Sequence, residues 1–217
     1  MARAFERPAT LPLPDHVGVG QVLDGLLVPV PGAKASAVIA PPHPQMGGSM
    51  ASPVVSEVAW ASERAGLASL RFDWRGVGAS SGEASGDARQ ADIDLACAAA
   101  FLSGTFDGPL VACGYSFGAI AALRFGCVTN SVKGMVLVAP PTGMMNPETL
   151  LTFEGPLLVV AGQTDSWVDF RALGEATLEA PDVQVEVLPD CDHFFMTQLG
   201  PLSRCIEAWL IDAAIEG

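Results

Sequence analysis

The stretch Gly114-Tyr115-Ser116-Phe117-Gly118 joins a strand-like apolar run, Pro109–Cys113, to a helix-like, alanine-rich run, Ala119–Leu123. A GxSxG nucleophile elbow requires this strand–turn–helix context. The elbow holds its serine in a strained backbone conformation, so the residues two positions away must lack side chains. The stretch therefore predicts that Ser116 is a catalytic nucleophile at the end of a buried strand. The alternative is an ordinary strand-to-helix turn.

Strand-like and helix-like segments alternate along the rest of the chain. Several strand candidates are apolar on both faces, as in parallel strands that helices cover on both sides. The candidates are Ala35–Ala40, Leu70–Trp74, Pro109–Tyr115, Gly134–Ala139, Pro156–Ala161 and Val183–Leu188. We expect an α/β fold with a mostly parallel central sheet and helices on both faces. A further strand, Gln21–Val30, should run antiparallel to the others because its connection to residue 35 is short.

Apolar stripes at helical spacing predict helices between the strands. One helix should begin with Ser52 as its cap and Pro53 in its first turn, and should end at Gly66. Two more helices are predicted by the stripes Ile93, Ala96, Cys97, Ala100, Phe101 and Leu202, Cys205, Ile206, Trp209, Leu210, Ala213.

Length and composition limit the possible classes of protein. The 217 residues suit one domain that spans residues 1–217, and half of them are apolar. Asp and Glu number 24 against 11 Lys and Arg, a formal charge of −13, which disfavours nucleic acids and anionic membrane surfaces as partners. The sequence predicts no cofactor and no metal site, and it leaves the oligomeric state open.

Cysteine usage and the amino-terminal segment bear on location. The five cysteines are odd in number and show no CxxC spacing, which favours reduced thiols and a cytoplasmic protein. Met1–Thr10 lacks the apolar stretch of a signal peptide, and no apolar run is long enough to span a membrane.

A serine hydroxyl needs a base to take its proton, and the base needs an orienting acid. His193 is the only histidine after Ser116, and it follows the strand Val183–Leu188. It should therefore lie at the carboxyl ends of the strands, where Ser116 also emerges. Asp165 directly follows the strand Pro156–Ala161, and Ser, Asp, His is an order in which such triads occur. We predict a Ser116–His193–Asp165 triad, with a surface loop histidine as the alternative for His193.

Three other acids compete with Asp165. Asp190 and Asp192 are too close in sequence to His193 to approach its ring easily, and Asp169 is expected to cap a helix that begins at Phe170.

An oxyanion hole needs two N–H donors. The Phe117 amide should supply one, and the loop after the strand Ala35–Ala40 should supply the other. Pro44 in this loop has no N–H, which favours Gln45, with Met46 as the alternative. The neighbouring His43 is expected to shape the loop through hydrogen bonds.

The substrate pocket should be open, because Pro140–Gly155 is too short for a cap domain. Apolar side chains near the predicted triad are candidates for its walls, with core packing as the alternative for each. Candidates for substrate binding are Met46, Met144, Trp167 and Phe194, with Trp74, Met145, Leu150, Leu151 and Phe153 as further possible wall residues.

Four motifs together resemble those of small bacterial lidless α/β-hydrolases. Pro42-His43-Pro44-Gln45-Met46-Gly47-Gly48-Ser49-Met50 looks like their HPHP-x-x-GG-x-M loop, and Phe72–Gly82 resembles their F-N-F-R-G-V-G-x-S-x-G turn. Gly114–Gly118 and Asp192-His193-Phe194-Phe195 match as well, so the resemblance covers about residues 36 to 200. The chain departs from the pattern at Pro41 and at Asp73, where the usual residues are His and Asn. A more distant resemblance is to dienelactone hydrolases, which use a Cys nucleophile.

The turn Arg75–Gly82 has a second interpretation. Its glycines follow a strand, as in a dinucleotide-binding loop. That interpretation needs the first strand of a βαβ unit, whereas these glycines follow roughly the third strand. The resemblance implies instead a tight structural turn in which Arg75 and Ser80 fix loops beside the elbow.

The resemblance implies the α/β-hydrolase fold without a cap domain and a cytoplasmic serine hydrolase of carboxylesterase or thioesterase type. Together with the predicted triad, it leads us to expect cleavage of small to medium acyl esters or thioesters through an acyl-enzyme on Ser116. Two alternatives remain at this point. One is acyl transfer or perhydrolysis on the same triad, and the other is a non-catalytic α/β-hydrolase that binds a ligand.

Overall fold

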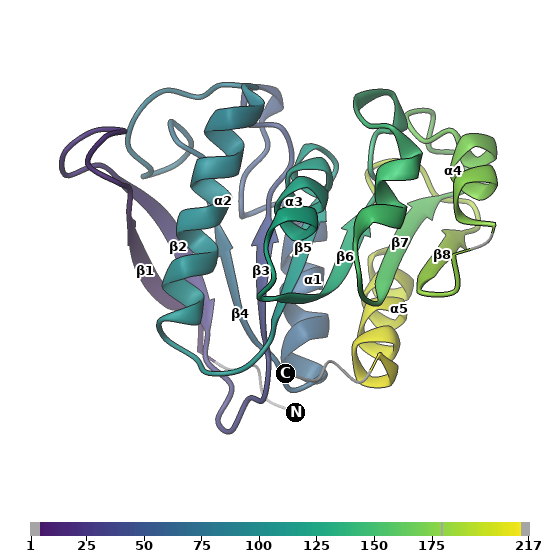
Figure 1. The fold of residues 1–217 in the computed structure, drawn as a ribbon, viewed down its shortest axis with the longest axis horizontal. Helices are drawn as coiled ribbons and strands as arrows, with labels where there is room; N and C mark the ends of the chain where they lie inside the picture. The colour runs from purple at the N-terminus through teal and green to yellow at the C-terminus, as the bar shows by residue number, and fades with distance from the viewer. Residues whose placement is uncertain (1–4, 179, 214–217) are drawn as a thin grey trace.

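A computed structural model describes residues 5–178 and 180–213 and contains one eight-stranded sheet (Figure 1). The strand order is β1-β2-β4-β3-β5-β6-β7-β8. The strands are β1 (Arg7–Pro12), β2 (Val22–Val28), β3 (Ser36–Ala40), β4 (Ala68–Phe72), β5 (Leu110–Tyr115), β6 (Val132–Val138), β7 (Leu157–Gly162) and β8 (Val183–Leu188). Six of them, β4-β3-β5-β6-β7-β8, pair in parallel, and all six are predicted strands with ends shifted by at most two residues.

The two amino-terminal strands complete the sheet. β2 runs antiparallel to β1 and to β4, which confirms the direction predicted for Gln21–Val30. The strand β1 was not predicted. It lies at the edge of the sheet and contains Pro8 and Pro12, residues that normally argue against a strand but are tolerated on an edge. Residues 1–4 of the segment Met1–Thr10 lie outside the described residues.

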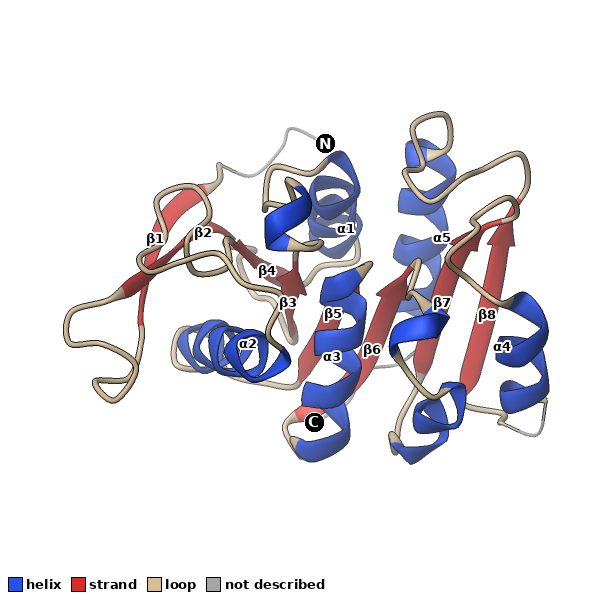
Figure 2. Ribbon diagram, turned by 90° about the horizontal axis from the view of Figure 1, so that it is seen from above, coloured by secondary structure: helices blue, strands red, loops and turns tan. Residues whose placement is uncertain are grey.

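Helices cover both faces of the sheet (Figure 2). α2, α3 and α4 lie on one face, and α1 and α5 lie on the other. The bounds are α1 (Pro53–Arg64), α2 (Ala88–Ser103), α3 (Phe117–Val128), α4 (Phe170–Thr177) and α5 (Leu199–Asp212), with short 3-10 helices η1 (Pro44–Met46), η2 (Thr142–Met144) and η3 (Pro147–Thr152). Each face has its own cluster of buried apolar side chains, so the core has two layers. These features match the predicted fold class.

Helix α1 has the predicted bounds but lacks one predicted interaction. Gly66 follows it in the left-handed region, with φ of 84°, as expected for a residue after a helix end. The Ser52 side chain makes no capping hydrogen bond, so Pro53 alone marks the helix start.

Helix α2 buries a different face from the one predicted. Its buried residues are Ala91, Asp94, Leu95, Ala98, Ala99 and Leu102, whereas Ala96 and Ala100 of the predicted stripe are exposed. The reason is Asp94, which is fully buried because it pairs with Arg75. Because Asp94 is a charged residue, the sequence pattern indicated that this face of α2 is exposed. For α5, by contrast, the predicted stripe is confirmed at Leu202, Ile206, Trp209 and Leu210.

The sheet topology opens a crevice at one end of the strands. β3 and β5 are neighbours, but the chain passes from β3 to β4 on one side and returns to β5 on the other. The loops after β3 and β5 therefore diverge, and ligands of α/β sheets bind in such a crevice.

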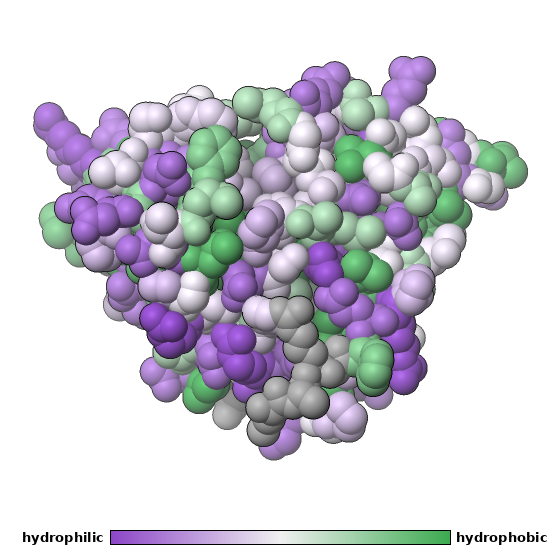
Figure 3. Space-filling view, turned by 180° about the vertical axis from the view of Figure 1, so that it is seen from behind, coloured by the Kyte–Doolittle hydropathy of each residue, from purple (hydrophilic) through white to green (hydrophobic). Residues whose placement is uncertain are grey.

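The face that carries α1 and α5 mixes hydrophilic and hydrophobic residues without a single large apolar area (Figure 3). All five cysteines are free thiols. Within residues 5–178 and 180–213, no helix has both the length and the apolar character needed to cross a membrane.

Candidate active site

Ser116 occupies a tight turn between β5 and α3. Its backbone is in a strained conformation, with φ of 55° and ψ of −119°. A Cβ atom on Gly114 would overlap the Gly118 carbonyl, and one on Gly118 would overlap the Ala40 carbonyl at the end of β3. The two glycines thus allow the close approach that the elbow pattern predicts, and the turn lies in the crevice between β3 and β5.

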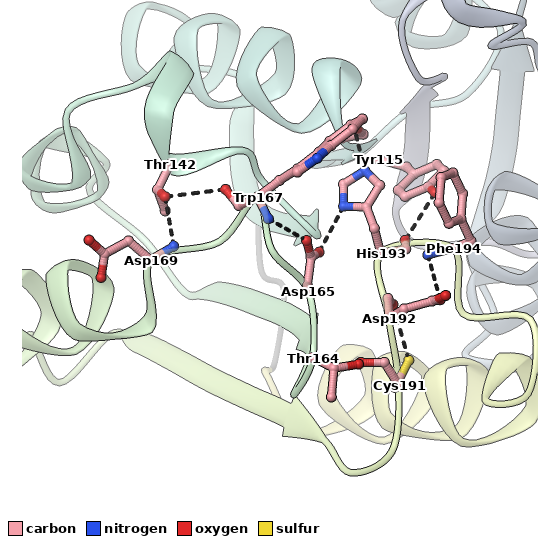
Figure 4. Close-up of polar contacts among 11 residues, drawn as sticks. Tyr115, Thr142, Thr164, Asp165, Trp167, Asp169, Cys191, Asp192, His193 and Phe194 are labelled. Atoms are coloured by element: carbon pink, nitrogen blue, oxygen red, sulfur yellow. Dashed lines mark hydrogen bonds and ion pairs between the residues drawn. The ribbon is translucent and has the colours of Figure 1, made fainter.

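The structure brings the three predicted triad residues into one hydrogen-bonded chain, and Figure 4 shows His193 and Asp165 facing one another. His193 Nε2 lies 3.0 Å from Ser116 Oγ, and His193 Nδ1 lies 2.7 Å from Asp165 Oδ2. All three side chains are buried. The second carboxylate oxygen of Asp165 accepts the Trp167 N–H at 2.9 Å, so both oxygens of this acid have partners and its orientation is fixed.

Loop contacts hold His193 from two sides. The Tyr115 hydroxyl donates to the His193 carbonyl at 3.1 Å, and the Thr164 hydroxyl donates to the Cys191 carbonyl at 2.9 Å. Burial, followed by the nearby Asp165 charge, raises the pKa of the Tyr115 phenol, so this donor keeps its proton at neutral pH. Burial also raises the pKa of the Cys191 thiol to about 11, which leaves it neutral. The nucleophile's strand and the acid's loop therefore both anchor the histidine loop.

Two of the three acids that competed with Asp165 accept backbone amides elsewhere. The Asp192 carboxylate accepts the Phe194 amide at 3.0 Å. The Asp169 carboxylate accepts the amides of Arg171 and Ala172, which confirms its predicted role as the cap of α4. Asp165 is the acid that reaches the ring of His193.

Thr142, on the loop after β6, clamps the loop that carries Asp165. Its amide and hydroxyl both donate to the Trp167 carbonyl, at 3.1 and 3.3 Å. Its hydroxyl also accepts the Asp169 amide at 2.8 Å. No sequence motif pointed to Thr142, because a threonine in a proline-rich loop carries no distinctive signal.

The two amides that the sequence predicted as oxyanion donors, those of Gln45 and Met46, form hydrogen bonds inside the loop after β3. The Gln45 N–H donates to His43 Nδ1 at 3.2 Å, and the Met46 N–H donates to the His43 carbonyl at 3.0 Å. The first bond confirms that His43 shapes this loop. Within the described residues, the amides of His43 and Phe117 have no acceptor. The rings of these two residues pack edge to face with centroids 4.9 Å apart, so the two open amides belong to contacting residues beside Ser116.

Two further contacts fix this loop to the sheet. Trp74 Nε1 donates to the carbonyls of Pro41 and Pro42 at 3.0 and 3.1 Å. Asp73 Oδ1 accepts the Met50 amide at 2.6 Å. Trp74 is 1% exposed, so the expectation that it lines the pocket is wrong. An indole that packs in the core beneath the loop looks the same in sequence as one that faces a pocket.

The predicted structural turn Arg75–Gly82 is also tied down. Arg75 Nε lies 2.6 Å from Asp94 Oδ1. The Ser80 hydroxyl accepts the Asp24 amide and donates to the Asp73 carbonyl. Both residues thus fix neighbouring segments, as the resemblance implies.

Two hollows meet at Ser116, one of about 590 Å³ and one of about 370 Å³. Met46 and Trp167 line both, Met144 lines the larger, and Phe194 lines the smaller. The four candidates for substrate binding therefore all face space beside Ser116.

The other proposed wall residues do not line these hollows. Leu150 and Phe153 are buried in the core, Met145 packs against it, and Leu151 is exposed. The whole segment between β6 and β7 is described and contains only η2 and η3, so the site has no cap domain above it. Among the described residues, no cluster of three or more His, Cys, Asp or Glu side chains is arranged to bind a metal ion.

Comparison with known proteins agrees with this architecture. Residues 46–153 match the family model of the S33 serine aminopeptidases. A lidless α/β serine hydrolase from Xanthomonas campestris is 28% identical, with 94% of each chain covered and a TM-score of 0.79. An α/β serine hydrolase homologue from Coxiella burnetii is 24% identical, with 93% of this chain and 96% of that chain covered and a TM-score of 0.81.

A dienelactone hydrolase from Anabaena variabilis is 21% identical, with 97% of this chain and 99% of that chain covered and a TM-score of 0.78. No curated protein matches the sequence. The chain has the α/β-hydrolase fold, and its similarity to the S33 family model and to the lidless serine hydrolase from Xanthomonas campestris supports a hydrolase activity.

Proposed function

We propose that this protein is a serine hydrolase that cleaves esters or thioesters with small to medium acyl groups through an acyl-enzyme on Ser116. One observation carries the proposal: the buried, continuous hydrogen-bonded chain from Ser116 Oγ through His193 to Asp165. A serine that is held in a strained turn and bonded to an oriented histidine fits nucleophilic catalysis. The resemblance of the four sequence motifs to those of small lidless serine hydrolases supports this proposal.

The mechanism follows from the geometry. His193 Nε2 takes the proton of Ser116 as Oγ attacks the acyl carbon, and Asp165 stabilises the imidazolium that forms. The acyl carbon–heteroatom bond then breaks, and His193 donates its proton to the leaving oxygen or sulfur. A water molecule, deprotonated by His193, attacks the acyl-enzyme. The acid leaves and Ser116 regains its proton, so atoms and charge balance over the cycle.

The oxyanion hole is assigned to the amides of Phe117 and His43, in place of Gln45. The Gln45 and Met46 amides are already bonded inside their own loop. The His43 and Phe117 amides are open among the described residues, and both residues line the larger hollow beside Ser116. Donors that are held in place before the reaction are the ones that stabilise an oxyanion well.

The test is covalent labelling with a fluorophosphonate, followed by intact mass, together with hydrolysis of p-nitrophenyl acetate. We expect one adduct per chain in the wild type, and loss of both the adduct and at least about 10⁴-fold of the activity in Ser116→Ala. Ser103→Ala is the matched control, because Ser103 is exposed at the end of α2. Persistent labelling of Ser116→Ala, or an unlabelled and inactive wild type, would rule out the proposal, and the second result would favour a non-catalytic ligand-binding protein.

A further inference from the structure

The two hollows at Ser116 extend in different directions. The larger continues between the loop after β6, with Pro141 and Met144, and the segment with Trp167 and Val168. The smaller continues between the start of α1, with Ser52, and the histidine loop, with His193 and Phe194. Their shared walls are His43, Met46, Ser116 and Trp167. An ester also has two arms, which diverge from one reacting carbon.

Proton transfer decides which arm occupies which hollow. The leaving oxygen must come within hydrogen-bond distance of His193 Nε2, since that nitrogen gives it a proton. His193 lines the smaller hollow and does not line the larger. The arm that leaves therefore lies in the smaller hollow, and the acyl arm lies in the larger.

The walls determine the chemistry that fits. In the larger hollow, Met46, Met144, Pro141 and Val168 present apolar surface, and Trp167 and Phe194 do so in the smaller. Among the described residues that line the two hollows, none is lysine or arginine. The one carboxylate near the acyl arm, Asp169, caps α4. Together with a formal charge of −13, these walls disfavour an anionic arm on either side.

We infer that the substrate is a neutral ester with a longer apolar acyl arm in the 590 Å³ hollow and a shorter apolar alcohol arm in the 370 Å³ hollow. This inference rests on the proposed function and narrows it. It predicts that coenzyme A thioesters are poor substrates, because the lining of the two hollows contains no lysine or arginine and the chain has a formal charge of −13. It also assigns Gly143 and Ser52 as positions that set the specificity for one arm each.

The two positions allow a reciprocal experiment. A Cβ on Gly143 would meet nothing within 4 Å, so Gly143→Leu should narrow the larger hollow without backbone strain. Ser52 makes no side-chain capping bond, so Ser52→Leu should narrow the smaller hollow and leave α1 intact. The probes are methyl and benzyl acetate, which vary the alcohol, and methyl acetate and methyl octanoate, which vary the acyl chain.

For Gly143→Leu we expect the octanoate-to-acetate ratio of kcat/KM to fall at least about tenfold, with the benzyl-to-methyl ratio within about twofold of wild type. For Ser52→Leu we expect the benzyl-to-methyl ratio of kcat/KM to fall at least about tenfold, with the octanoate-to-acetate ratio within about twofold of wild type. Met144→Asp, which adds a charge to the larger hollow, should lower octanoate turnover as Gly143→Leu does. The assignment of the arms would be overturned if each variant lowered the ratio expected for the other. It would also be overturned if both variants changed the two ratios equally, or changed neither.

Charge is tested on the wild type with one acyl group on two thiols. The hexanoyl thioester of neutral N-acetylcysteamine should turn over at least about tenfold faster than hexanoyl-coenzyme A, as expected for a site that repels anions. Equal rates would overturn the inference of a neutral substrate. Failure of the proposed function would look different from failure of this inference. In that case the wild type itself would hydrolyse no ester and would form no adduct with the fluorophosphonate.

Discussion

The Thr142 hydroxyl accepts a 2.8 Å hydrogen bond from the amide of Asp169, although the two residues follow different strands of the sheet. The same hydroxyl donates to the Trp167 carbonyl, and the Trp167 amide in turn donates to Asp165. Thr142 is thereby connected, through Trp167, to the acid that bonds His193. It acts as a positioning residue for Asp165 and has no contact of its own with the reacting atoms.

Thr142→Val keeps the shape of the side chain but leaves the Asp169 amide without its acceptor. Because Asp165 would then be less firmly held, we expect kcat to fall about tenfold, which corresponds to about 1.4 kcal/mol. The fall should be the same for acetate and octanoate esters, and Thr142→Ser should recover most of the activity. If the loss grew with acyl length, or if Thr142→Ser did not restore kcat, Thr142 would be acting as a pocket wall and not as a positioning residue.

Proline can remove the proposed His43 donor directly. His43 has φ of −60°, the value at which a proline ring is locked, so His43→Pro should delete the N–H and leave the backbone in place. We expect its kcat to be about 10² to 10³ lower than that of His43→Ala, which keeps the amide and loses only the ring. Equal kcat for the two variants would show that the second oxyanion donor lies elsewhere, and Gln45 would again be the candidate.

The fold and the predicted triad could be derived from the sequence because both depend on local patterns. Short runs that are apolar on both faces and alternate with helix-like segments indicate a buried parallel sheet. The order of Ser116, Asp165 and His193 along such strands then places their loops at the same edge. Neither step requires knowledge of loop conformation.

The details that the sequence missed depend on contacts between distant segments. Which amide after β3 stays open depends on where the His43 ring turns, because its Nδ1 accepts the Gln45 N–H. The buried face of α2 depends on the partner of Asp94, which is nineteen positions away on another segment. Trp74 was misassigned for the same reason, since its acceptors are the carbonyls of Pro41 and Pro42.

The buried pair of Arg75 and Asp94 should be costly to break. Arg75→Met would leave the fully buried Asp94 carboxylate without its cation, and we expect the free energy of unfolding to fall by about 3 to 5 kcal/mol. Arg75→Met combined with Asp94→Asn should regain a large part of this, because the amide oxygen can still accept the backbone N–H of residue 75. Urea denaturation is the measurement.

Arg171→Met, which removes an exposed pair with Glu175, is the control and should change stability by less than about 0.5 kcal/mol. A double variant as unstable as Arg75→Met alone would contradict this account.

Asp73 gives the stability a predictable dependence on pH. Burial raises the pKa of its carboxyl from the ordinary value of 3.8, and the nearby Asp24 adds to this, while the Met50 amide and Arg71 oppose it. Between 3.8 and the raised pKa, the folded state holds the proton more tightly than the unfolded state does. The stability contributed by this group is therefore lost as pH rises through the folded pKa.

Asp73→Asn removes this loss and keeps an oxygen that can accept the Met50 amide. We expect the variant to be more stable than the wild type near neutral pH, and the difference to shrink toward zero as pH falls to about 4. Urea denaturation from about pH 4 to about pH 8 measures this difference, with Asp107→Asn as the control because Asp107 is exposed. A difference that does not vary with pH, or that grows toward acid pH, would show that the charge of Asp73 is not what limits stability here.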